Sequence, residues 1–158
     1  MANMTLAGFI SHIATAQARI EKHTHKALEK AAKIVETEAK RELGHYQGAA
    51  GPFVAWAELK QETKDERVRL KWTENDPGLR SGEMLRSISH IVGKNEAVVG
   101  SNDQKMVWFE LGTGKQPPRS ALGGAAFRKE KQIVHALASP VVTGLMGNDV
   151  HNGYFPIK

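Results

Sequence analysis

Histidine is the residue type in this sequence with the most evident capacity for metal chemistry, and seven histidines are present. His23 and His25 lie two residues apart, which would place them on different sides of a helix rather than at the i,i+4 spacing of a helical zinc pair. The other five occur singly along the chain. The sequence has no cysteine, which excludes a thiolate site and a disulfide framework. We therefore expect no metal site.

A second candidate for chemistry is the glycine-rich segment Gly112–Lys115, which is similar to part of a phosphate-binding loop. It lacks the wider glycine spacing of such loops and the Ser or Thr after the lysine that holds magnesium. Pro117 and Pro118 follow where a helix should begin. No Ser-His-Asp set or paired carboxylates with a recognisable local context accompany it. The sequence therefore predicts a protein without a cofactor and without catalytic activity.

The composition is that of a globular protein, with 158 residues, of which 41% are hydrophobic and 25% charged. The formal net charge is +5, but 17 acidic residues are mixed among the 22 basic ones, so the electrostatic indication of a nucleic-acid partner is weak. The N-terminus lacks the order of a signal peptide, and no apolar run is long enough to span a membrane. We expect one soluble domain covering residues 1–158, with no membrane partner.

A long helix is predicted over residues 1–44, because apolar residues recur at three- and four-residue steps from Leu6 to Leu43. Gly44 is placed to end it. A straight helix of this span would measure roughly 57 Å, which exceeds the width of a domain of this size. The helix must therefore break, with the region His23–His25 as the candidate, or project from the domain to contact a partner.

The rest of the chain predicts a small sheet followed by a second helix. Residues 45–66 are expected to form a loop and residues 67–111 an antiparallel meander, with strands at 67–72, 87–92, 97–99 and 106–109. In the first strand Arg67, Arg69 and Lys71 would form one basic face, either solvated or directed at an acidic protein or DNA. A loop at 112–120, a helix at 121–139 and an extended tail at 140–158 would complete an α+β fold.

Several motifs occur in an order that resembles the phage neck and virion-morphogenesis proteins. The resemblance begins with Trp56-Ala57-Glu58-Leu59 and Thr63, followed by Leu79-Arg80-Ser81-Gly82-Glu83-Met84-Leu85-Arg86-Ser87-Ile88. It continues with Val98-Val99-Gly100-Ser101, Val107-Trp108-Phe109-Glu110-Leu111-Gly112-Thr113 and Pro117-Pro118-Arg119. The blocks cover roughly half of the chain, and together they are more specific than any one of them. Ser120-Ala121-Leu122 departs from the Pro-Phe-Leu that usually follows, and Trp108 stands where a Tyr-Ala pair is usual.

The resemblance implies a long N-terminal helix packed on a small antiparallel sheet, with a second helix near the C-terminus and long protruding loops. It also implies a structural virion subunit that acts in tail completion or head–tail joining and is assembled in the host cytoplasm. Such subunits form a homo-oligomeric ring, expected to be a hexamer, between the head connector or stopper and the tail tube or tail terminator. The exact layer of the neck stays open, as does passing contact with DNA in the channel. Alternatives are a small basic nucleic-acid-binding protein and an assembly chaperone absent from the mature virion.

The candidate subunit contacts lie at the end of the predicted sheet and in the loop that follows. They are Glu110, Gly112, Thr113, Lys115 and Arg119. Charged groups of both signs close together can exchange ion pairs with the next copy around a cyclic axis. Arg119 is the strongest candidate, because its planar guanidinium can engage a carboxylate or several carbonyls at once.

Overall fold

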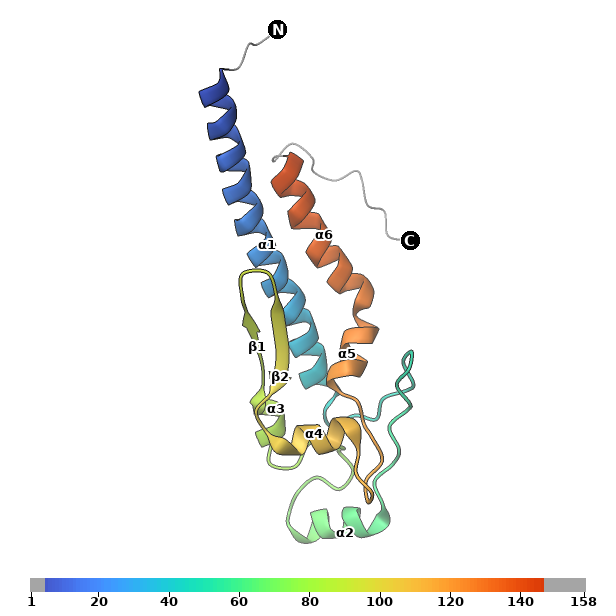
Figure 1. Ribbon diagram of the computed structural model, residues 1–158. Coiled ribbons are helices and arrows are strands. Elements are labelled where there is room, and N and C mark those ends of the chain that lie inside the picture. Colours follow the sequence, from blue (N-terminus) through green and yellow to red (C-terminus); the bar gives the residue numbers. More distant parts are fainter. Residues whose placement is uncertain (1–4, 147–158) are drawn as a thin grey trace.

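The computed structural model describes residues 5–146, and these form an α+β fold dominated by one long helix, as the sequence predicted. Helix α1 runs unbroken from Leu6 to Glu42. Thr5 caps its start by accepting a hydrogen bond from the Gly8 amide at 3.1 Å. Of the two expectations for this helix, projection is therefore correct and a break near His23–His25 is wrong. Its N-terminal end extends beyond the other elements (Figure 1).

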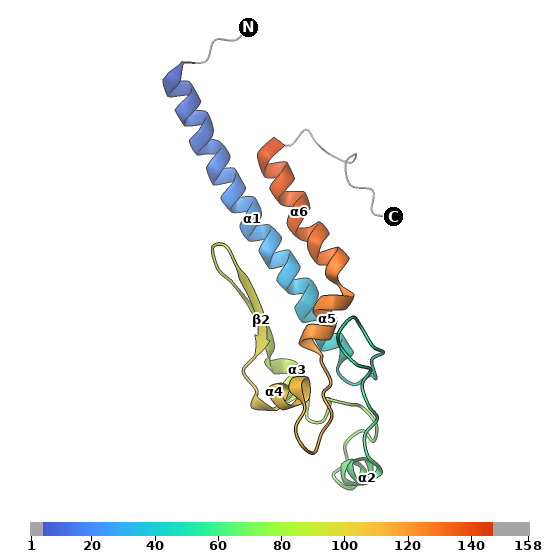
Figure 2. The same ribbon diagram turned by 45° about the vertical axis from the view of Figure 1, so that its right-hand side comes forward.

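The remaining elements gather around the C-terminal half of α1. Helices α5 (Leu122–Arg128) and α6 (Glu130–Met146) lie along one side of it, and the hairpin of β1 (Ile88–Val92) and β2 (Ala97–Ser101) lies along another (Figures 1 and 2). Short helices α2 (Gln61–Arg69), α3 (Glu83–Ser87) and α4 (Gln104–Leu111) form the end opposite the N-terminus. No helix in residues 5–146 is long and apolar enough to cross a membrane.

The core combines a small-residue helix interface with a cluster of larger side chains. Alanines on α1, α5 and α6 are buried where these helices meet, and small side chains allow close approach of the backbones. In the cluster of larger side chains, Trp56 packs edge to face on Phe109, with ring centroids 5.1 Å apart and planes at 89°. The larger buried residues are Leu43, Trp56, Met84, Ile88, Met106 and Phe109. The apolar stripe of α1 is therefore covered only in its C-terminal half.

The turn at residues 75–78 closes this core. Gly78 has a φ of +74°, a conformation that L side chains rarely adopt. A Cβ there would come within 2.7 Å of a Leu43 methyl carbon and 2.9 Å of the Phe109 ring. The amide of Gly44 donates to the Pro77 carbonyl at 2.8 Å, which ties this turn to the end of α1. A glycine is thus required both by the backbone and by the packing.

The predicted meander is wrong in extent, because its first strand is replaced by the end of a helix and a turn, and its last strand by a helix. Residues 61–69 form α2, since the run before Arg67 consists mostly of good helix formers, and the alternation after it is too short to override them. Arg67 is buried at 2% exposure, so the expected basic strand face does not exist. The described sheet has two strands, paired antiparallel with Ile91 opposite Val98.

The predicted strand at 106–109 is helix α4 because local signals define both of its ends. Asp103 caps the start, with its carboxylate accepting from the Lys105 amide at 2.9 Å. Gly112 ends it, donating its amide to the Trp108 carbonyl at 3.0 Å. Met106 and Phe109, three residues apart, are buried on one side. A helical period therefore explains the apolar pattern better than a strand does.

The predicted helix at 121–139 is interrupted once and then runs further than expected. Lys129, with φ −101° and ψ 8°, separates α5 from α6. Helix α6 continues through Pro140 to Met146, so the first part of the predicted extended tail is helical. Residues 147–158 of that tail, and residues 1–4 at the other end, lie outside the described residues.

A buried carboxylate joins α1 to β1. Glu36 accepts a hydrogen bond from Lys40 Nζ at 2.6 Å and contacts His90 Nδ1 on the strand. Its side chain is 8% exposed. The hydrogen bond from Lys40 is the largest influence on the pKa of Glu36, which is lowered to about 2. The folded protein therefore stabilises the charged form of this carboxyl.

This lowered pKa predicts an acid-sensitive contribution to stability. A carboxyl whose folded pKa lies below its ordinary value of 4.5 stabilises the fold above that value, and the contribution disappears as the pH falls towards about 2. Between about pH 5 and about pH 3, the wild type should lose more stability than Glu36→Gln. Thermal unfolding of both proteins checks this, with Glu29→Gln as a control at an exposed position on the same helix. Parallel pH profiles for wild type and Glu36→Gln would contradict it.

Candidate functional site

Glu110, the first predicted contact residue, uses its carboxylate inside the subunit. It stands near the end of α4 and accepts hydrogen bonds from the amides of Ala121 (2.8 Å), Leu122 (3.0 Å) and Gly123 (2.8 Å). The Ser120 hydroxyl donates to the same carboxylate. These amides open α5, where unpaired N–H groups and the helix dipole favour a negative charge. Glu110 therefore caps α5 from a distance in sequence.

Arg119 is also directed into the subunit, against the expectation that it faces a neighbour. Only 4% of the residue is exposed. Its Nε donates to the Ala57 carbonyl at 2.9 Å and its Nη2 to the Glu58 carbonyl at 3.2 Å. Its backbone amide donates to the Phe109 carbonyl at 2.7 Å. The guanidinium thus holds the segment after Trp56 against the end of α4, and burial lowers its pKa.

The loop between Glu110 and Arg119 carries the other three predicted residues, and it is exposed. Thr113 pairs with Gln116 through backbone hydrogen bonds, the shorter being 2.8 Å from the Thr113 amide, which folds the loop into a narrow turn. Gly112 has a φ of +76°, and a Cβ there would come within 2.8 Å of the Pro118 nitrogen. Lys115 is exposed on this turn. The loop is therefore shaped by Gly112 and presents Thr113 and Lys115 outward.

An exposed apolar face on α4 adjoins this loop, and the sequence interpretation missed it. Val107 is 45% exposed, Trp108 51% and Leu111 73%, and their spacing places them on one side of the helix. We call these three residues the α4 face. The signal was available in the sequence as an apolar set at i, i+1 and i+4, but it was concealed by the assignment of the segment to a strand.

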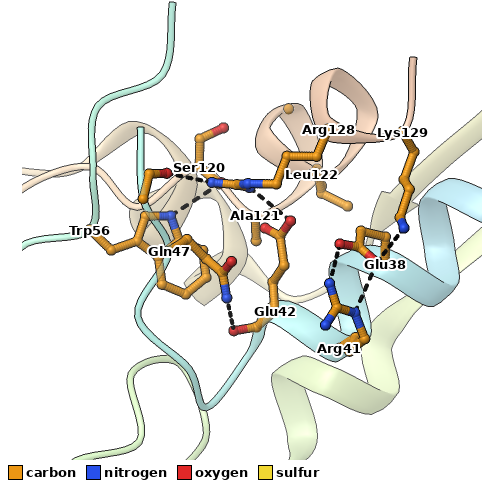
Figure 3. A network of polar contacts seen from close by, with 12 residues as sticks. Glu38, Arg41, Glu42, Gln47, Trp56, Ser120, Ala121, Leu122, Arg128 and Lys129 are labelled. Atoms are coloured by element: carbon orange, nitrogen blue, oxygen red, sulfur yellow. Dashed lines mark hydrogen bonds and ion pairs between the residues drawn. The ribbon is translucent and has the colours of Figure 1, made fainter. Parts of the chain in front are cut away.

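A polar network fixes the end of α5 and its junction with α6 to α1 (Figure 3). Glu42 is completely buried, and its Oε1 accepts from Arg128 Nη1 at 2.7 Å. Arg128 Nη2 also donates to the Gly48 carbonyl at 2.6 Å. One turn earlier on α1, Glu38 lies between Arg41 and Lys129, whose Nζ is 3.5 Å away. Burial, as the largest influence, raises the pKa of Glu42.

The histidines and the glycine-rich segment that lie within residues 5–146 occupy separate parts of the fold. Within residues 5–146, no group of three or more His, Asp or Glu side chains is placed to hold a metal ion. His90 instead contacts Glu36. The segment Gly112–Lys115 lies in the exposed turn and is followed by extended residues, so it does not open a helix as a phosphate loop does.

The residues that resemble the phage neck proteins mostly serve as scaffold. Trp56, Met84, Ile88 and Phe109 belong to the core, and Glu110 and Arg119 make the internal contacts described above. No protein-family model, curated protein or solved structure matches the chain. The resemblance therefore stays a prediction from the motifs.

Proposed function

We propose that this chain is a structural virion subunit of a tailed bacteriophage that acts in tail completion or head–tail joining. The observation that carries the proposal is the ordered run of motifs from Trp56 to Arg119. These residues form the scaffold that brings α3, α4 and the start of α5 together. Motif residues that occupy core positions support a shared architecture better than motif residues on a variable surface would.

The distribution of exposed apolar residues supports an assembly role. Besides the α4 face, they occur on the outer face of the hairpin, where Ile91 is 74% and its partner Val98 59% exposed. They also occur on the projecting end of α1, where Leu6 is 75% and Ile10 59% exposed. Groups of exposed apolar side chains of this kind are typical of contacts with other proteins. In a closed ring each subunit has two neighbours, which can cover surfaces on different sides of it.

The proposed assembly is a homo-oligomeric ring, with a hexamer as the expected stoichiometry. Its partners are the head connector or stopper on one side and the tail tube or tail terminator on the other. The role is mechanical and needs no cofactor. The basic strand face no longer supports a DNA-binding role, because Arg67 is buried instead of lying on such a face.

The direct test is an inventory of the particle. The phage whose genome encodes this chain is purified, and its proteins are identified by mass spectrometry. The proposal expects the chain in mature particles, at a copy number that matches a ring. Its absence from mature virions would favour an assembly chaperone, and submicromolar, steeply salt-dependent binding to duplex DNA would favour a nucleic-acid-binding protein.

The α4 face provides a more specific prediction. The double variant Val107→Ser/Leu111→Ser should keep the stability of the monomer, because both side chains are exposed, but it should reduce ring formation at least tenfold. Native mass spectrometry on the purified protein and the yield of tailed particles measure this. The matched control is Val68→Ser/Leu70→Ser, the same chemical change at exposed positions near the end of α2. Normal rings in the first variant would remove the α4 face from the proposed interface.

A further inference from the structure

Two buried arginines line one cavity at the end of the molecule that carries α2 and α4. The cavity has a volume of about 590 Å³, and Arg67 and Arg119 both border it. Arg67 is 2% and Arg119 4% exposed. Within the described residues, neither guanidinium has a carboxylate within 4.0 Å, although buried charges in proteins are usually paired. Asp76 acts on Arg67 from a longer distance, so the cavity is bordered by two guanidinium groups that form no direct ion pair with a described carboxylate.

Only some of the N–H groups of each guanidinium donate hydrogen bonds within the protein. Arg67 donates from Nε to the Thr73 carbonyl (2.7 Å) and from Nη2 to the Leu79 carbonyl (2.6 Å) and the Thr73 hydroxyl. Arg119 uses Nε and Nη2 in the same way on Ala57 and Glu58. In both residues Nη1 has no hydrogen-bond partner among the described residues. Among the described residues, Glu42 Oε2 is the one side-chain polar atom that is both fully buried and without a hydrogen-bond partner. The two Nη1 atoms also lack a partner, so each of them must keep some exposure to solvent.

The remaining charges around the cavity are already matched. Arg80 lies 3.2 Å from Glu66 and also stacks over the Trp72 ring, at 4.8 Å from its centroid. Lys105 lies 3.0 Å from Glu83. The two rim acids therefore compensate the two rim cations, and the excess positive charge belongs to the recessed arginines. Burial lowers the pKa of both Arg67 and Arg119, but an arginine stays charged at neutral pH.

The shape and walls of the cavity favour a peptide over a phosphate. Leu59, Met84, Trp108 and Phe109 supply apolar wall, and the volume far exceeds the roughly 30 Å³ of one water-sized occupant. A small ion would leave these walls uncovered. The convex phosphate backbone of a duplex would meet the rim, where charges are paired, but would not reach recessed guanidinium groups. A carboxylate side chain with apolar neighbours reaches both the arginines and the walls.

We propose that this cavity binds an acidic peptide segment of a partner protein, in which a carboxylate flanked by apolar side chains docks on Arg67 and Arg119. The carboxylate accepts a hydrogen bond from an Nη1 group that the protein leaves unpartnered, and the apolar neighbours lie on Trp108 and Leu59. The site adjoins the exposed turn through Gln116, but Thr113 and Lys115 are not among its lining residues. It does not depend on the proposed place of the chain in a virion.

The test uses the isolated full-length protein and two synthetic peptides. One is acetyl-leucyl-aspartyl-phenylalanyl-amide, and the other has asparagine in place of aspartate. Binding is followed by NMR on the indole N–H signals of the three tryptophans. Trp72 and Trp108 border the cavity and should shift, whereas Trp56, whose indole donates to the Ser120 carbonyl, is not one of its lining residues and serves as reference. The aspartyl peptide should bind about tenfold more tightly, because hydrogen bonds to a charged acceptor are about twice as strong as neutral ones.

A negative charge introduced on the cavity wall tests the site from the side of the protein. Gln116 borders the cavity, so Gln116→Glu should weaken binding of the aspartyl peptide about tenfold while leaving the fold intact. Gln17→Glu on α1 makes the same charge change at an exposed site far along the sequence and should have no effect. Equal affinity for the two peptides would overturn the proposal. So would indole shifts produced by inorganic phosphate or duplex DNA but by neither peptide. Because no virion is involved, failure here leaves the neck proposal untouched.

Discussion

Replacing Arg128 by alanine is expected to destabilise the fold by about 3–5 kcal/mol, the range found when one partner of a buried ion pair is removed. The reason is the environment of Glu42, which is completely buried and has Arg128 as its ion-pair partner at 2.7 Å. Its Oε2 already lacks a hydrogen-bond partner among the described residues. Removing the guanidinium leaves a buried carboxylate between α1 and α5 with only the weaker, more distant attraction of Arg41 to compensate its burial.

The stability lost in Arg128→Ala should be larger at neutral than at mildly acidic pH. Burial raises the folded pKa of Glu42 above its ordinary value of 4.5, and Arg128 opposes that rise. A carboxyl with a raised folded pKa favours the fold below its unfolded pKa, and this contribution is lost as the pH rises through the folded pKa. In Arg128→Ala the pKa should rise further, so the variant should be weakest at neutral pH. Its deficit relative to the wild type should shrink as the pH falls towards about 4.5.

Urea unfolding of both proteins at neutral and mildly acidic pH measures this prediction. Arg41→Ala is the control, because Arg41 is 69% exposed in its side chain and Glu38 keeps Lys129 as a second partner. The double variant Glu42→Gln/Arg128→Met removes both charges and should recover part of the stability. A stable Arg128→Ala with a flat pH profile would show that the buried pair contributes little to this fold.

The parts of the fold that the sequence predicted well depend on local signals. The helix from Leu6 to Glu42 follows from its period and from Gly44, and the hairpin follows from two short apolar runs separated by a polar turn. The turn at Gly78 follows from the residue types around it. In each case the information lies within a few residues of the element that it defines.

The two errors in the sheet arose where a short apolar alternation fits both a strand and a helix. At residues 106–109 the deciding information was the pair of caps, Asp103 and Gly112, which an alternation count ignores. At residues 67–72 the helix-forming run before Arg67 decided the outcome. Because both segments were predicted to be strands, the exposed α4 face and the buried position of Arg67 could not be recognised.

The candidate site was predicted in part, and the missing part depends on contacts between distant backbone atoms. Gly112, Thr113 and Lys115 lie in an exposed loop, as expected of contact residues. Arg119 binds carbonyls about sixty residues earlier in the chain, and a backbone carbonyl leaves no trace in residue type. A charge whose partners are backbone groups therefore looks like a surface charge in a sequence.

Glu110 is a second charged residue whose partners are mainly backbone groups, and its replacement gives the second large prediction. Helix α5 has only seven residues, and Ala121 at its start offers no side-chain cap. The carboxylate of Glu110 replaces that cap by accepting three backbone amides and the Ser120 hydroxyl. Hydrogen bonds to a charged group are each worth about 1.5–3 kcal/mol, and they are not additive when they share one acceptor. We expect Glu110→Ala to cost about 2–4 kcal/mol in unfolding free energy.

This prediction separates a structural role from the subunit contact that the sequence suggested. Glu130→Ala is the matched control, because Glu130 is an exposed carboxylate in the first turn of α6. Hydrogen exchange of the amides of Leu122 and Gly123 should become faster in Glu110→Ala and stay unchanged in the control. If Glu110→Ala instead melts like the wild type and only ring formation fails, the carboxylate serves a neighbouring subunit. If both melting and exchange change as expected, Glu110 acts on assembly only by holding α5 and the exposed loop at residues 112–118 in place.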